Sequence, residues 1–173
     1  MKINNRMNDT SRVNNDLAFD LLVMWYAFFQ GLHIPVDIKS FVSLKRANSV
    51  FHYPPPIDGW SDQALNFFEI LFVLDLINAI LSLVFVYGFF KHARWRWWLG
   101  AIALTASICM IIVFDYATIA SGAWDNNLAP YLSTNILLLP TWVLFFLFLR
   151  RSYSQPIFPP TLTGDENWKP EEE

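Results

Sequence analysis

The sequence contains a single cysteine, Cys109, among 173 residues. One thiol cannot form a disulfide within the chain, so the fold has to be stable without covalent cross-links. The paired Cys or Cys/His spacing of structural zinc sites is missing. The glycine-rich sequences G-x-x-x-x-G-K-[ST] and G-x-G-x-x-G, which bind phosphate groups, are missing too. We therefore expect neither a metal nor a cofactor.

Neither sign of charge is in large excess. The chain has 12 Lys and Arg against 15 Asp and Glu, for a formal net charge of −3. Much of the negative charge lies near the end of the chain, in Asp165, Glu166, Glu171, Glu172 and Glu173. A basic face that would bind nucleic acid is absent, so we expect no nucleic-acid partner.

Apolar residues are what the sequence has in excess. They make up 54% of the chain and are concentrated in blocks, whereas a soluble domain averages about 45–50%. Four blocks reach the ~20 residues that cross the hydrocarbon of a bilayer. The sequence therefore predicts an all-α membrane protein, a four-helix transmembrane bundle with spans at about 17–36, 65–90, 97–120 and 130–149.

Three regions follow from this pattern. Residues 1–16 form a polar N-terminal segment, residues 17–151 a four-span transmembrane domain, and residues 152–173 a proline-rich acidic tail. Pro35 closes the first span in this prediction. The long loop that follows contains FHYPPPIDGW, in which three prolines prevent regular helix. Such a loop could cap one mouth of the bundle.

The basic residues are distributed unequally between the two sides of the predicted bundle. Cytoplasmic loops carry an excess of Lys and Arg, and four spans return the chain to its starting side. We therefore expect both termini to be cytoplasmic. Nine basic residues share one side, namely Lys2, Arg6, Arg12, Lys91, Arg94, Arg96, Arg150, Arg151 and Lys169, and three share the other, namely Lys39, Lys45 and Arg46.

Five polar side chains interrupt the apolar blocks: Asp20, Glu69, Asp75, Asn78 and Asp115. A charge at the bilayer centre costs roughly 2.5–3.5 kcal/mol even on a lenient scale. Asp20 and Glu69 lie near span ends and can reach the interface, and Asn78 can link helices by hydrogen bonds. Asp75 and Asp115 lie deep, so each is either a protonated, hydrogen-bonded carboxyl or an anchor for a cationic ligand.

His33 and Asp37 are four residues apart, which places them on one helical face if helix persists past Pro35. A histidine beside a carboxylate can shuttle protons. A histidine next to proline at a helix end is also a common interfacial residue, so the spacing leaves both interpretations open.

Several short motifs occur in one order between about Leu17 and Arg151. Together they resemble the EXPERA superfamily, which includes the sigma-2 receptor and the emopamil-binding sterol isomerase. The resemblance implies a four-span fold, residence in the endoplasmic reticulum or a related endomembrane, and a sterol or lipophilic amine as ligand. The motifs are Gly31–Pro35 (GLHIP), Phe67–Phe72 (FFEILF), Phe114–Tyr116 (FDY), Ala129–Leu132 (APYL) and Asn135–Pro140 (NILLLP).

The resemblance also implies roles for individual residues. His33 and Asp37 match the His-x-x-x-Glu of the isomerase, with Asp in place of Glu, and would be the catalytic pair. Glu69, Asp115 and Asn135 match polar residues that face the ligand. In the isomerase such groups would move a sterol double bond by protonating one carbon and deprotonating another. The resemblance supplies no role for Asp75.

The ligand cavity would be lined by aromatic side chains, whose faces stabilise a cation. Leu138 stands where the isomerase has tryptophan, and the size of the chain fits the sigma-2-like branch. The resemblance therefore favours binding without catalysis. The aromatic lining predicted for the ligand is Tyr26, Phe29, Phe72, Tyr116 and Trp142.

Two kinds of function remain open. The protein binds a sterol or lipophilic amine in an intramembrane cavity, with possible isomerase chemistry, or it is a structural subunit of a larger membrane complex. The partners would be a lipid and the bilayer, together with either a second copy of the chain or other subunits. A channel is a weaker alternative, because the spans lack a repeated pore-lining pattern.

Overall fold

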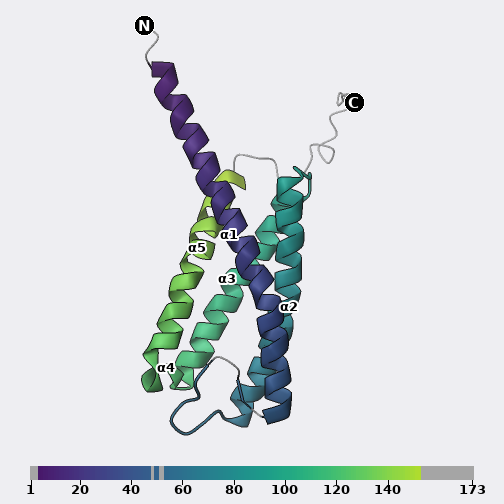
Figure 1. Cartoon of the computed structure of the whole chain (residues 1–173), viewed down its shortest axis with the longest axis vertical. Helices are drawn as coiled ribbons and strands as arrows, with labels where there is room; N and C mark the ends of the chain where they lie inside the picture. The colour runs from purple at the N-terminus through teal and green to yellow at the C-terminus, as the bar shows by residue number, and fades with distance from the viewer. Residues whose placement is uncertain (1–3, 48, 51–52, 153–173) are drawn as a thin grey trace, which may run out of the picture.

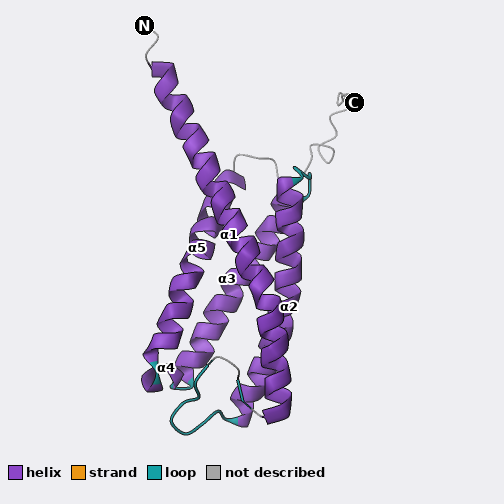
Figure 2. Cartoon of the chain, in the orientation of Figure 1, coloured by secondary structure: helices purple, strands orange, loops and turns teal. Residues whose placement is uncertain are grey.

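The computed structural model describes residues 4–47, 49–50 and 53–152 (Figure 1). Four long helices dominate it, and the described residues include no strand (Figure 2). The predicted all-α class is thereby confirmed. The helices are α1 (Asn4–Ala47), α2 (Asp62–Phe90), α3 (Arg96–Ala120) and α5 (Leu128–Ser152), with a single turn, α4 (Ala123–Asn126), between the last two.

All four long helices have the length and the apolar composition needed to cross a bilayer. The candidate spans are Asp16–Ala47, Asp62–Phe90, Arg96–Ala120 and Leu128–Ser152. Large apolar side chains also cover the outside of the bundle, where Ile70, Ile77, Ile112 and Ile136 are each more than half exposed. Water would penalise such a surface whereas lipid solvates it, so the chain is an integral membrane protein.

Successive long helices run in opposite directions and close into a ring. Helix α1 packs on α2, α2 on α3, α3 on α5, and α5 again on α1. The start of α1, the α2–α3 turn and the end of α5 lie at one end of the bundle, and the α1–α2 loop and α4 lie at the other (Figure 1). Both ends of the described chain are therefore on the same side, although the assignment of that side to the cytoplasm stays a prediction.

Helix α1 is longer than the sequence predicts, because it continues through Pro35 to Ala47. A proline inside a helix removes its own N–H bond and crowds the carbonyl four residues earlier, here that of Gly31. The last turns of α1 bury Ser40 and Leu44, and this packing offsets the cost of the proline. The predicted polar segment likewise turns helical at Asn4, and the predicted tail from residue 153 onward lies outside the described residues.

The main apolar core lies toward the end of the bundle where the chain starts. It joins Phe19 and Val23 of α1 to Phe85 of α2 and Phe148 of α5. The rings of Phe85 and Phe148 meet edge to face, with their centroids 5.6 Å apart. Gly100 of α3 faces this ring pair, and a Cβ at Gly100 would lie 2.6 Å from carbon atoms of both rings. Gly100 therefore allows α3 to approach α2 and α5 closely.

We expect Gly100→Ala to destabilise the bundle by about 1–3 kcal/mol, the usual cost of overpacking a core. The measurement is unfolding in detergent micelles. Gly31→Ala is the matched control, because nothing lies within 4 Å of its added Cβ. Equal stability of the two variants would contradict the close approach at Gly100.

Candidate functional site

A cavity of about 100 Å³ lies between α1, α2, α3 and α5. One part of its wall is apolar and aromatic, including Phe29, Phe72 and Phe114. Another part is polar and is formed mainly by one face of α1 and one face of α2. A small apolar pocket with a few convergent polar groups is the usual form of a ligand site. The polar residues on these two helices are Gln30, His33, Asp37, Ser40, Asp75 and Asn78.

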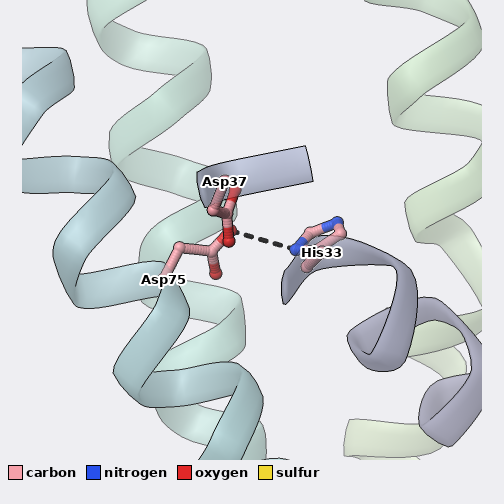
Figure 3. A group of neighbouring side chains, drawn as sticks. All are labelled: His33, Asp37 and Asp75. Carbon is pink, nitrogen blue, oxygen red and sulfur yellow. Dashed lines mark hydrogen bonds and ion pairs between the residues drawn. The ribbon is translucent and has the colours of Figure 1, made fainter. Parts of the chain in front are cut away.

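Three of these residues form a compact cluster, the triad His33, Asp37 and Asp75 (Figure 3). His33 and Asp37 are one helical turn apart on α1, and Asp75 reaches them from α2. His33 Nδ1 and Asp75 Oδ2 are 3.0 Å apart, whereas Asp37 is only 5% exposed and its Oδ2 atom has no hydrogen-bond partner. The contact between His33 and Asp75 thus joins α1 and α2, whereas Asp37 Oδ2 is a buried carboxylate oxygen without a partner.

The charge of the cavity is carried by these three groups. Neither Lys nor Arg lines it, so a protonated His33 balances only one of the two carboxyls when both are ionised. One ligand atom from each residue lies within 4.8 Å of the others. An imidazole nitrogen and two carboxylate oxygens are also a donor set that a divalent cation such as Zn²⁺ accepts. The triad is therefore a place where positive charge is stabilised.

A second polar group lies next to the triad and deeper in the bundle. The side-chain amides of Gln30 and Asn78 both donate to Ser107 Oγ of α3, at 3.4 and 2.9 Å. Ser107 Oγ lies 2.7 Å from the hydroxyl of Tyr26, which lies 2.6 Å from Ser82 Oγ. Since lipid offers no hydrogen bonds, such groups have to find their partners inside the bundle.

The loop between α1 and α2 covers one end of the cavity. Tyr53 lines the cavity and packs on Phe114 and Tyr131, at centroid distances of 4.8 and 5.6 Å. The Tyr131 hydroxyl donates to the carbonyl of Pro54 at 3.1 Å, and Asn126 donates to the carbonyl of Pro55 at 2.6 Å. These contacts hold the loop as a cap, and the surrounding rings raise the pKa of Tyr53 to about 12 by burial.

Of the residues that the sequence analysis assigned to the site, His33, Asp37 and Phe72 line the cavity, as does the aromatic Phe29. Tyr26 is fully buried in the hydrogen-bonded group behind it. Their roles in catalysis and ligand binding stay predictions.

The other predicted site residues lie elsewhere in the bundle. Glu69 forms an ion pair with Lys45, and Asn135 donates to Asp115 Oδ1 at 3.0 Å. Tyr116 is 75% exposed, and Trp142 packs against the cluster of Ile108, Ile111 and Leu138, of which the last two line the cavity. None of these five predicted residues lines the described cavity.

Other residues enter the cavity without having been assigned to it. Asp75 was recognised as costly, but its partner was not. Gln30 lies three residues before His33 and seven before Asp37, so the helical period could have placed it on the same face. Ser107, Thr141 and Tyr53 lie on elements whose contact with this face depends on tertiary packing, and no local pattern marks them.

Searches of family models, curated proteins and solved structures give no match to this chain. What the fold and the site define is a class: an integral membrane four-helix protein with a polar, capped cavity among its helices. The residues of that cavity are therefore what indicates a function for this chain.

We expect a double-mutant cycle of His33→Ala and Asp75→Ala to give a coupling energy of about 0.5–3 kcal/mol, because the two groups are in contact. Unfolding free energy in detergent is the quantity to measure. The exposed pair between Asp16 and Arg151 (2.9 Å) is the comparison, and its coupling should not exceed about 1 kcal/mol. A coupling near zero for His33 and Asp75 would argue against the contact between α1 and α2.

The raised pKa of Tyr53 predicts that the folded protein loses stability at high pH. Since its pKa is raised from 10.0 to about 12, its contribution is complete below pH 10.0 and is lost as the pH rises through 12. Two pKa units correspond to about 2.7 kcal/mol. Tyr53→Phe keeps the ring but cannot ionise, so it should lose less stability than the parent over this interval. Identical pH profiles of unfolding would contradict a buried phenol in the cap.

Proposed function

We propose that this protein binds a lipophilic amine or a sterol in the cavity between its four helices. The observation that carries the proposal is the triad, in which two carboxyls and one imidazole face an aromatic cavity within the membrane-spanning part of the chain. Ionisable groups within a membrane usually bind a ligand or an ion, or transfer a proton.

The charge balance favours a cationic ligand. With His33 protonated and both carboxyls ionised, one negative charge is left in a cavity that has no Lys or Arg in its lining. A singly charged ammonium group would neutralise that charge. It would also lie among the rings of Phe29, Phe72 and Phe114, whose faces attract a cation.

The loop cap supports the same function. Tyr53 of this loop lines one end of the cavity, where its ring packs on Phe114 and Tyr131. Apolar surroundings lower the local dielectric constant and so strengthen electrostatic interactions in the cavity. The cap would therefore increase the affinity of the two carboxylates for a cation.

Sterol-isomerase chemistry is the catalytic form of this proposal. It draws support from the contact between His33 and Asp75, since a carboxylate orients a histidine for proton transfer. Catalysis would additionally require a substrate carbon within reach of the imidazole. Binding without catalysis needs only the charge and the aromatic wall, so it is the function that we propose first.

A structural subunit of a larger membrane complex is the alternative. The apolar exterior of the bundle suits lipid and other subunits equally well, so it does not separate the two functions. Solubilisation in mild detergent followed by size measurement does separate them. A stable complex with other chains would favour the subunit, and a dimer of this 20.1 kDa chain would favour the binding protein.

We expect Asp37→Asn and Asp75→Asn each to weaken binding of octylamine by at least about tenfold. Removing one partner of a buried charged contact usually costs 2–5 kcal/mol or more, and about 1.4 kcal/mol is tenfold in affinity. Binding is measured by calorimetry with the full chain in lipid nanodiscs, in the presence of a chelator so that no divalent cation competes.

Asp20→Asn is the control, because Asp20 lies in α1 outside the cavity lining. Glu69→Gln and Asp115→Asn test the positions that the family resemblance implies. If these two variants lose octylamine while the Asp37 and Asp75 variants retain it, the ligand site is elsewhere in the bundle.

A further inference from the structure

Unpaired buried atoms are concentrated at one place in the described chain. Among its buried side-chain nitrogen and oxygen atoms, six have no hydrogen-bond partner. Two are the indole nitrogens of Trp25 and Trp60, which lie outside the cavity lining. The other four all belong to residues that line the cavity, and all four are oxygens. These are Gln30 Oε1, Asp37 Oδ2, Asn78 Oδ1 and Thr141 Oγ1.

The direction of the neighbouring hydrogen bonds explains why oxygens remain. Gln30 and Asn78 both use their NH₂ groups to donate to Ser107 Oγ. Ser107 Oγ also lies 2.7 Å from the Tyr26 hydroxyl, a contact in which either oxygen can donate. The Tyr26 hydroxyl in turn lies 2.6 Å from Ser82 Oγ and donates to the carbonyl of Ala103 at 3.4 Å. One N–H of each amide is therefore used within this network, whereas Gln30 Oε1 and Asn78 Oδ1 have no partner.

An unpaired buried acceptor costs about 1–3 kcal/mol, and more when it is charged. Three such acceptors around one space, together with the Thr141 hydroxyl that can accept or donate, favour an occupant that offers several N–H or O–H donors. Asp37 is only 5% exposed and Gln30 only 3% exposed, so bulk solvent does not reach them freely. The occupant has to bring its donors into the cavity.

The charge of the occupant follows from the triad. With His33 protonated and both carboxyls ionised, one negative charge is unbalanced, and a single positive charge neutralises it. A primary ammonium provides this charge with three N–H donors. A tertiary ammonium provides only one donor and a quaternary ammonium none, so both would leave acceptors unpaired.

The size of the cavity limits the rest of the occupant. A cavity of about 150 Å³ is known to accept benzene, and this one is about 100 Å³. It therefore holds a head group and the first carbons of a chain better than a fused ring system. The aromatic wall beside the triad suits a hydrocarbon chain.

We propose that the cavity selects single-chain amphiphiles with a primary ammonium head group over those with tertiary or quaternary heads. This inference rests on the proposed function, and it commits that function to the amine rather than the sterol.

The test is an amine series with one chain length, measured by calorimetry on the full chain in nanodiscs at neutral pH with a chelator. The probes are octylamine, N,N-dimethyloctylamine, octyltrimethylammonium and octanol, and empty nanodiscs give the partitioning background. We expect octylamine to bind at least about tenfold more tightly than octyltrimethylammonium, with the dimethyl amine between them and octanol weakest. Cholesterol in the nanodisc should not reduce the affinity for octylamine.

The outcomes distinguish a failure of the primary-ammonium selectivity from a failure of amine binding itself. Equal or reversed affinities among the three amines would overturn the primary-ammonium selectivity while leaving amine binding intact. Tight octanol binding, or loss of octylamine on adding cholesterol, would overturn the selectivity as well. Absence of any amine binding above the background would remove the proposed function itself.

Two variants test whether the unpaired oxygens cause the selectivity for a primary ammonium. Gln30→Met and Thr141→Val remove an acceptor with little change in volume. Both should weaken octylamine several-fold and leave octyltrimethylammonium unchanged. Ser133→Ala is the control, because Ser133 lies outside the cavity lining and its hydroxyl donates to the carbonyl of Pro130 at 2.8 Å. An unchanged ratio of the two affinities in both acceptor variants would overturn the inference.

Discussion

Hydrocarbon offers no hydrogen-bond partner, so the polar side chains of the four spans have to be satisfied inside the bundle. The contact between His33 and Asp75 meets this constraint across α1 and α2, and the Ser107 hydroxyl meets it for Gln30 and Asn78. The same constraint makes the exceptions informative. Where acceptors remain unpaired, they surround one cavity, which is why the structure directs attention to a ligand there.

The cavity depends on the length of α1. Had the helix ended at Pro35, Asp37 and Ser40 would not follow His33 on one helical face, and the triad would lose one of its carboxyls. The helix continues because its last turns pack on α2, where Lys45 pairs with Glu69. The cap completes the site from the opposite direction, since Tyr53 is held between Phe114 and Tyr131.

Hydropathy was enough to predict the four spans, because each apolar block exceeds the thickness of the bilayer hydrocarbon. The helical period also placed His33 with Asp37 and Asp75 with Asn78. The helical period does not say which faces of α1 and α2 meet, so it could not predict that His33 contacts Asp75. The separation of Glu69, Asp115 and Asn135 from the cavity depends on how α2, α3 and α5 rotate against one another. That rotation is set by packing such as the close approach at Gly100.

The central claim is that the triad holds a basic amphiphile within the membrane. Mass spectrometry of the small molecules that co-purify with the intact protein tests it most directly, with an Asp37→Asn Asp75→Asn double variant prepared in parallel. The account predicts an amine-bearing amphiphile that is enriched with the parent protein and depleted from the double variant. The same bound molecules in both preparations, or no amine in either, would contradict it.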